Sequence, residues 1–173
     1  NGCNLNDPLM RHTKVTLDES TVGGMSGATF TDENGTYKFY TRTGLFNLTP
    51  IFENPYFITT PASAQIDFPA LDGSTQTQNF CISPNGIHND VELTVLPGLL
   101  RPGFDSTFTL AYKNKGNQIM SGNITFSYDD ATHDLISSDT AIDSQNQNSL
   151  SWNYNQLMPF ETRYIHITLN LNS

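Results

Sequence analysis

The sequence is poor in charge, in helix-forming residues and in long apolar runs. Charged residues make up 14% of the 173 residues, and 17 acidic against 8 basic residues give a formal net charge of -9. That charge would repel a nucleic-acid backbone or an anionic membrane, so nucleic acid is excluded as a partner. No apolar run approaches the roughly 20 residues that a membrane-spanning helix needs, so we expect no direct membrane insertion.

Residues that usually carry catalysis are also sparse. The four histidines are dispersed, and no two of them lie at the spacing of metal ligands. They are His12, His88, His133 and His166. Serines are numerous, but no Gly-x-Ser-x-Gly nucleophile motif is present. We therefore expect no enzyme activity, no catalytic residue and no cofactor-binding residue.

Calcium is the one metal for which the sequence offers candidate ligands, in two groups of oxygen donors. Asn1 and Asp7 lie in a polar segment that resembles the tail of an Asp-x-Asn-x-Asn-Gly calcium loop. Asp129, Asp130 and Asp134 cluster near the end of an expected strand. The alternative, which we favour, is a plain turn in the first case and a solvated acidic turn in the second.

Cysteine is limited to Cys3 and Cys81, neither of which has a Cys-x-x-Cys partner or a nearby histidine. In an oxidising compartment the even count favours one disulfide, which would stabilise the fold by roughly 4 to 5 kcal/mol through loop closure. The alternative is two free, buried thiols. No signal-peptide pattern opens the chain, and because Asn1 is not a start residue we expect a mature or excised part of something longer.

What the sequence has in abundance is alternation of apolar and polar residues at the period of a β-strand. Phe104, Phe108, Leu110 and Tyr112 fall on alternate positions, followed by the turn-forming segment 114–117. The alternation then resumes with a further apolar set, which predicts a hairpin-like pair of strands. That set is Ile124, Phe126 and Tyr128.

Two later segments extend this pattern. Trp152, the only tryptophan, shares a strand face with Leu150 and Tyr154, so we expect it to anchor the core rather than to stack on a sugar. A long final strand is predicted from four alternate apolar residues, which are Ile165, Ile167, Leu169 and Leu171.

The first half of the chain has the same character. Asn34-Gly35 predicts a hairpin between residues 28–30 and 37–39, and a last strand is expected over 76–82. Residues 83–90 hold proline and Asn-Gly without apolar alternation, which indicates a boundary. We therefore predict an all-β fold of two tandem antiparallel β-sandwiches, residues 1–83 and 84–173.

Two sets of motifs resemble known families. Thr31-Asp-Glu-Asn-Gly-Thr-Tyr-Lys-Phe39 looks like the hairpin of carboxypeptidase-regulatory-like and Cna B-type domains, which are transthyretin-like sandwiches. A second set of motifs is similar to the sequence motifs of DUF11-like immunoglobulin sandwiches. Its members are Arg101-Pro-Gly-Phe104, Tyr112-Lys-Asn-Lys-Gly-Asn117, Ser149-Leu-Ser-Trp152 and Met158-Pro-Phe-Glu161. In Bacteroidetes surface proteins the two modules occur in this order before a type IX secretion sorting domain.

This resemblance implies a cell-surface or extracellular protein, exported through a bacterial outer membrane. By analogy to that family, the expected role is a non-enzymatic spacer or stalk segment of an adhesin or filament. The fold alone does not imply this role, because such sandwiches host many functions. The alternative is a glycan- or protein-binding accessory module of a secreted hydrolase. Expected partners are neighbouring domains of the same polypeptide, other copies in a filament, or surface glycans and proteins.

The same resemblance implies a glycoprotein. Bacteroidetes build O-glycans on a short Asp-Ser/Thr-x pattern, which occurs at Ser106 and at Thr140. Thr140 is the better candidate, because it lies in a long polar loop whereas Ser106 falls on an expected strand.

Overall fold

The computed structural model describes Cys3 and residues 9–173, and every regular element in that part of the chain is a β-strand. No described residue belongs to a helix long and apolar enough to cross a membrane. The all-β fold class predicted from the alternating pattern is therefore confirmed. The chain divides into two compact units, unit 1 (Asn1–Ile87) and unit 2 (His88–Ser173). Their assignment to the transthyretin-like and DUF11-like families stays a prediction.

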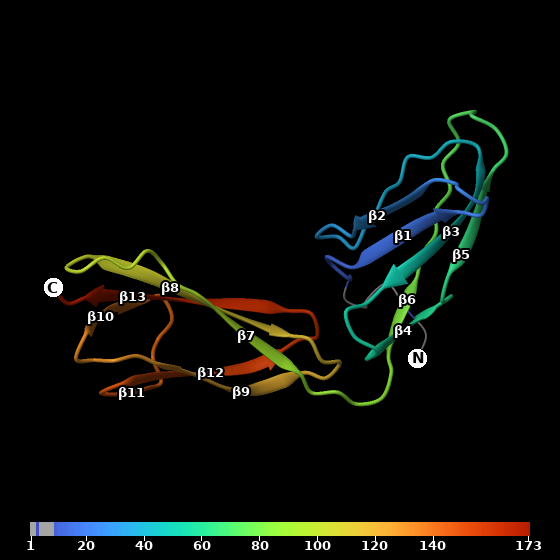
Figure 1. Cartoon of the computed structure of the whole chain (residues 1–173). Helices are drawn as coiled ribbons and strands as arrows, with labels where there is room; N and C mark the ends of the chain where they lie inside the picture. Colours follow the sequence, from blue (N-terminus) through green and yellow to red (C-terminus); the bar gives the residue numbers. More distant parts are fainter. Residues whose placement is uncertain (1–2, 4–8) are drawn as a thin grey trace. The chain divides into compact units, whose positions relative to one another are not determined.

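Unit 1 contains one four-stranded antiparallel sheet and one two-stranded sheet (Figure 1). The larger sheet has the order β2-β1-β3-β5, and the smaller pairs β4 with β6. The strands are β1 (Lys14–Glu19), β2 (Ser26–Phe30), β3 (Gly44–Ile51), β4 (Phe57–Thr60), β5 (Ala64–Phe68) and β6 (Cys81–Pro84). Side chains from one face of β1 and β3 form a small buried core, consisting of Val15, Leu17, Phe46 and Leu48.

The predicted disulfide joins Cys3 to Cys81, the first residue of β6, with the two Cα atoms 5.6 Å apart. It closes a loop between residues separated by 78 positions. Loop closure of that length removes many conformations from the unfolded chain, so the bond stabilises unit 1 chiefly through the unfolded state.

Two strand predictions in unit 1 are wrong. The turn at Asn34-Gly35 forms, with Gly35 at a φ of 68°, but β2 pairs with β1, and residues 37–39 join no sheet. Of the strand expected over 76–82 only the end is formed, as the start of β6. Aromatic side chains of both segments nevertheless pack against the core of unit 1. They are Tyr37, Phe39 and Phe80. The alternation of apolar and polar residues therefore predicted correctly which side chains are buried, but it did not predict which strands pair.

Unit 2 is a sandwich of a four-stranded and a three-stranded antiparallel sheet, seen as two layers in Figure 1. The first has the order β10-β13-β8-β7 and the second β11-β12-β9. The strands are β7 (Val91–Leu96), β8 (Asp105–Asn114), β9 (Met120–Ser127), β10 (His133–Ser138), β11 (Ser144–Asn146), β12 (Ser149–Leu157) and β13 (Thr162–Leu171). One core lies between the sheets and is larger than that of unit 1. Its buried members are Phe108, Leu110, Tyr112, Ile124, Leu150, Trp152, Leu157, Ile165, Ile167 and Leu169.

The hairpin predicted around residues 114–117 is also wrong, because β8 and β9 belong to different sheets. β8 pairs with β7 and β13, whereas β9 pairs with β12, so the connecting segment crosses from one layer to the other. Phe104, expected on the buried face of this strand, precedes β8 and is 58% exposed.

The predicted core position of Trp152 is confirmed, since only 2% of the residue is exposed. It lies on β12 opposite Ile124 of β9, and its indole N–H donates to the backbone oxygen of Thr140 at 3.3 Å. A tryptophan placed this way buries its ring and satisfies its single polar group, so it has no free face for a sugar.

Candidate functional site

The calcium candidates that the structure describes do not form a metal site. Among the described residues no three His, Cys, Asp or Glu side chains gather as metal ligands would. The carboxylate of Asp129 accepts the backbone N–H of Ala131, and Asp134 lies on β10 opposite Asn170 of β13. Asp130 accepts a long hydrogen bond of 3.4 Å from the hydroxyl of Tyr128. Asn1 and Asp7 lie outside the described residues.

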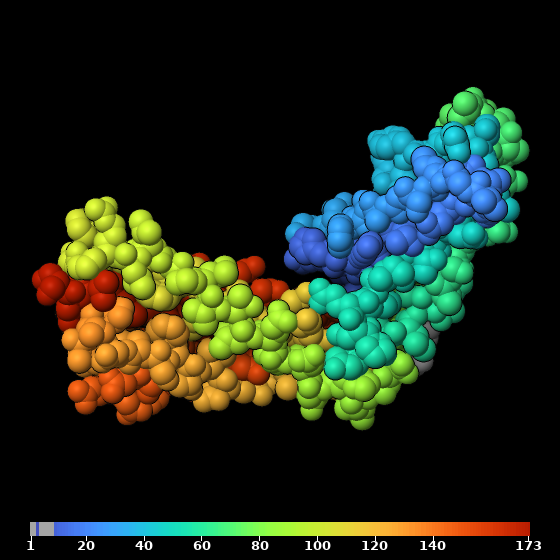
Figure 2. Space-filling view, viewed as in Figure 1, coloured from blue at the N-terminus to red at the C-terminus, as the bar shows by residue number. Residues whose placement is uncertain are grey.

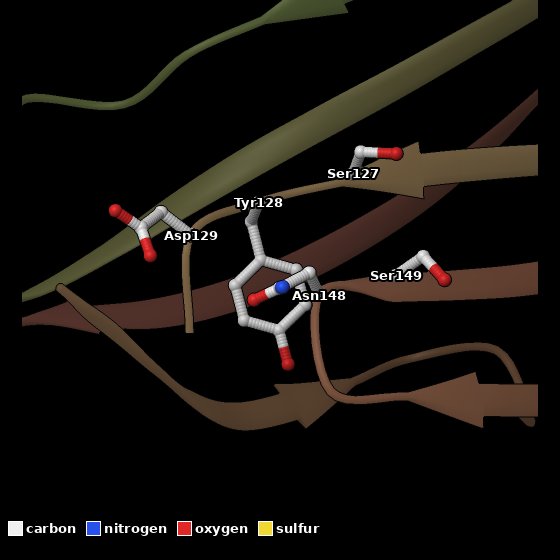
Figure 3. Close-up of a pocket in the computed structure, with 5 residues that line it drawn as sticks. All are labelled: Ser127, Tyr128, Asp129, Asn148 and Ser149. Atoms are coloured by element: carbon white, nitrogen blue, oxygen red, sulfur yellow. The ribbon is translucent and has the colours of Figure 1, made fainter. Parts of the chain in front are cut away.

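A shallow open hollow lies beside this acidic turn (Figure 3). Its lining comes from the ends of β9 and β12, where Ser127 and Ser149 face each other across the ladder. Figure 3 shows the carboxylate of Asp129 pointing away from Tyr128 and Asn148. All five lining residues are polar, but a hollow this open lacks the enclosure that is typical of small-molecule sites.

Asn114, at the end of β8, is a buried polar residue whose side chain is hydrogen-bonded at both its nitrogen and its oxygen. The residue is 0% exposed. Its side-chain amide donates to the backbone oxygens of Gln118 at 2.7 Å and Leu157 at 2.9 Å, and its side-chain oxygen accepts from the N–H of Gly116 at 2.9 Å. Because a buried amide left unpaired is costly, this set of bonds fixes the segment that crosses between the sheets.

The same segment fixes the start of unit 2, residues 88–90, which we call the clamp segment. The N–H groups of Lys115 and Gly116 both donate to the backbone oxygen of Asp90. Asn117 bonds His88 twice, by its own N–H to the His88 oxygen at 2.9 Å and by its side-chain oxygen to the His88 N–H at 2.8 Å. The point where the chain enters unit 2 is therefore tied to the polar network around Asn114.

The first and last strands of unit 2 lie on either side of β8. Both β7 and β13 are antiparallel to β8, so they run in the same direction. β7 begins opposite Asn114 at one end of β8, and Asn170 of β13 lies opposite Asp105 at the other end. The ladder hydrogen bonds are perpendicular to the strands. A pull on the two ends of unit 2 would therefore load both ladders in shear, with their bonds sharing the load.

Charged and phenolic groups cover the end of this ladder near Asn114. Arg163 of β13 contacts Glu161 at 2.6 Å and also donates to backbone oxygens of Asn155 and Gln156. Its guanidinium is the main cause that lowers the pKa of the Glu161 carboxyl, while partial burial acts in the opposite direction. Burial raises the pKa of the Tyr112 phenol. These groups hold the chain just before β13 and belong to no enclosed reaction site.

The two O-glycosylation candidates differ in access. Thr140 is exposed, and its hydroxyl contacts the carboxylate of Asp139 at 3.1 Å. Ser106 is only 4% exposed, and Gly98 packs against it. Its hydroxyl has no hydrogen-bond partner among the described residues. In the folded chain Ser106 is therefore closed to a modifying enzyme, and of the two candidates Thr140 alone stays a prediction.

A second surface feature lies entirely in unit 1. It is a groove between residues 38–42 and residues 68–76, which we call the rim groove. The aromatic residues Phe39 and Phe68 line it and also pack on the buried core. Tyr40, at its edge, is 87% exposed. Sequence reasoning missed this groove, because it assigned residues 37–39 to a paired strand of a hairpin and residues 72–74 to a turn between two strands.

The role of Asn114 was also missed, although a signal for it was present. It follows Phe108, Leu110 and Tyr112 at strand spacing, so the alternation places it on the inward face. A polar residue at an inward position of a strand indicates a buried hydrogen-bond network rather than a solvated turn.

No family model, curated protein or solved structure matches the chain, so what it does has to be argued from this geometry.

Proposed function

We propose that the chain is a non-enzymatic spacer or stalk segment of a secreted bacterial surface adhesin or filament, exported through the outer membrane. The observation that carries the proposal is the position of β7 and β13 on either side of β8, with the ends of unit 2 at opposite ends of the ladder. Such a unit resists extension because many hydrogen bonds must break together. A spacer that transmits force needs this property.

Three further features support a mechanical role. The clamp segment is tied to residues 115–117, so a pull entering unit 2 reaches a fixed point before it reaches β7. The disulfide of Cys3 and Cys81 limits how far unit 1 can extend when it unfolds. The exposed Thr140 offers a place for the O-glycan that the family resemblance implies.

Single-molecule stretching of the chain between marker domains tests this proposal. Unit 2 should unfold in one event at a force well above that of a helical bundle of similar size, with a length gain matching residues 88–173. Asn114→Ala should lower that force, because the crossing segment and the clamp segment lose their anchor. Extension of unit 2 without a force peak would contradict the proposal.

The alternative, an accessory module that binds glycan or protein, is favoured by one observation. Phe104 is 58% exposed in a loop of unit 2, with the guanidinium of Arg101 lying 4.9 Å from its ring centre. A glycan array and pull-downs with the whole chain test it. Binding that is lost in Phe104→Ala, with the fold intact, would favour this function over the spacer.

A further inference from the structure

The two sides of the rim groove have the side-chain pattern of strands without the pairing of strands. Residues 36–41 alternate between exposed and half-buried positions, and residues 77–80 do the same. This period of two is that of an extended strand. Their inward side chains, Tyr37, Phe39 and Phe80, cover the core of unit 1. We call residues 37–42 the first rim and residues 70–80 the second rim.

The backbone of neither rim is paired with another backbone. Within the described chain, no residue of 37–43 or 69–80 forms a backbone-to-backbone hydrogen bond. The backbone groups of Ser74, Gln78 and Asn79 do form hydrogen bonds, but their partners are side chains. Rows of N–H and C=O groups outside any ladder are what a sheet presents where a strand is missing.

The rims stand too far apart to pair with each other directly. Tyr37 donates its phenol hydroxyl to the backbone oxygen of Gln78 at 2.7 Å, and its ring centre lies 6.5 Å from that of Phe80. The side chain of Tyr37 thus bridges the two rims. In a β-ladder the neighbouring backbones would lie only about 4.8 Å apart, which leaves no room for a tyrosine ring between them. Farther along, residues 38–42 face residues 70–76 across the rim groove, so the rims run in opposite directions. Figure 2 shows the surface of unit 1, with the cyan and green parts of the chain that carry the two rims at the same end.

The core below the rim groove is also incompletely covered. Unit 1 buries four apolar side chains in its main core cluster, compared with ten in unit 2, although the two units are similar in length. Phe39 and Phe68 are only partly buried, and Leu71 is an exposed large apolar residue at the same groove. One more layer of apolar side chains would complete the burial of these residues.

We propose that the rim groove binds an extended polypeptide strand, which inserts between the two rims and joins them in a sheet. The free backbone groups on both sides select a peptide backbone, because it alone presents donors and acceptors at the strand repeat along both of its edges. The floor selects apolar side chains at alternate positions. The lining does not select a strongly charged peptide, since Arg42 is paired with Glu19 at 2.7 Å and the other two charged lining residues, Lys38 and Asp72, have opposite signs.

The probe is an uncharged, end-blocked peptide of the sequence Ser-Thr-Val-Thr-Val-Thr-Val-Ser carrying a fluorophore. A peptide of the same composition with its three valines contiguous is the matched control. Only the alternating peptide should bind the whole chain, one to one. On binding, hydrogen exchange should slow by at least about tenfold at alternate amides of residues 38–42 and 75–80, because the N–H groups that point into the rim groove gain partners.

Two further measurements separate backbone pairing from side-chain recognition. N-methylation of the three valines in the probe should abolish binding, and it requires no change in the protein. Tyr40→Pro, which removes one N–H of the first rim, should weaken binding about tenfold. Tyr40→Ala, which keeps that N–H and removes the exposed ring, should change binding little.

Each contrary result overturns the proposal. Absence of binding at about 1 mM peptide would show that the rim groove does not take a strand. Binding that survives N-methylation, or that is lost in Tyr40→Ala, would mean that side chains rather than backbone are recognised. Self-association of the chain that protects the same amides without peptide would show that a second copy occupies the rim groove.

Discussion

The buried side chain of Asn114 should contribute a large share of the stability of unit 2. Replacing it in Asn114→Ala removes a side chain with 0% exposure that holds three backbone groups, at 2.7 to 2.9 Å. The backbone oxygens of Gln118 and Leu157 then lose this donor, whereas the N–H of Gly116 keeps its second bond, to the backbone oxygen of Asp90. A buried group left unpaired costs about 1 to 3 kcal/mol, so we expect unit 2 to lose about 3 to 5 kcal/mol. Small domains have total stabilities of about 5 to 15 kcal/mol.

Urea unfolding followed by fluorescence measures this loss in unit 2 alone, because the chain has a single tryptophan, Trp152, which is 2% exposed in that core. Asn123→Ala is the matched control. Asn123 lies on an exposed position of β9 and makes only a long hydrogen bond of 3.4 Å to Ser151. Its replacement should change the free energy of unfolding by no more than about 0.5 kcal/mol.

The reasoning is refuted if Asn114→Ala costs less than about 1 kcal/mol, or no more than the control. Asn114→Asp adds an independent check, because a carboxylate would face the backbone oxygens of Gln118 and Leu157 without an N–H to donate. At neutral pH this variant should be less stable than the alanine variant. At acid pH the difference in stability between the aspartate and alanine variants should become smaller, since the protonated carboxyl of the aspartate can donate one hydrogen bond.

Three further predictions concern separate contacts. Cys81→Ser, which removes the disulfide across 78 positions, should lower the stability of unit 1 by about 4 to 5 kcal/mol in calorimetry and leave the Trp152 transition of unit 2 unchanged. Gly116→Ala should destabilise unit 2 by about 1 to 3 kcal/mol, because the added Cβ would meet the backbone of the clamp segment, whereas Gly27→Ala, with nothing within 4 Å, should be nearly neutral. The hydrogen bond from the guanidinium of Arg163 lowers the pKa of Glu161 from 4.5. The stability that this bond contributes is therefore complete above pH 4.5 and is lost as pH falls through the lower folded-state pKa. Unfolding curves of Glu161→Gln should show a weaker loss of stability in acid than the parent chain, and an unchanged acid profile would contradict the assignment.

Strand faces could be predicted from the sequence because alternation records which side chains avoid water. Leu110, Trp152 and Ile165 were assigned to the core on this basis and are buried. Burial does not determine the partner of a strand, however. A turn-forming segment such as 114–117 serves equally in a hairpin within one sheet and in a crossing between two sheets. In the structure Asn114 bonds Leu157, 43 positions away. The alternation indicates that Asn114 faces inward, but no local pattern identifies this distant partner.

The same distinction explains unit 1. Tyr37, Phe39 and Phe80 alternate as strand residues do and cover the core, so they were assigned to strands. Pairing requires a neighbouring backbone at the ladder distance, and in the described chain neither rim has one. The rim groove therefore lies where the sequence has the alternation of a strand but the backbone is not paired with a neighbouring strand. Such a site can be recognised only after the sheets are known.

The mechanical account is tested most directly by pulling unit 2 in two directions. Handles at residues 88 and 173 load the ladders of β8 in shear, whereas handles at residues 88 and 118 peel β7 from β8 one pair at a time. The account predicts a much higher unfolding force in the first geometry than in the second. Equal forces in both directions would contradict it, because the placement of β7 and β13 on either side of β8 would then confer no resistance to tension.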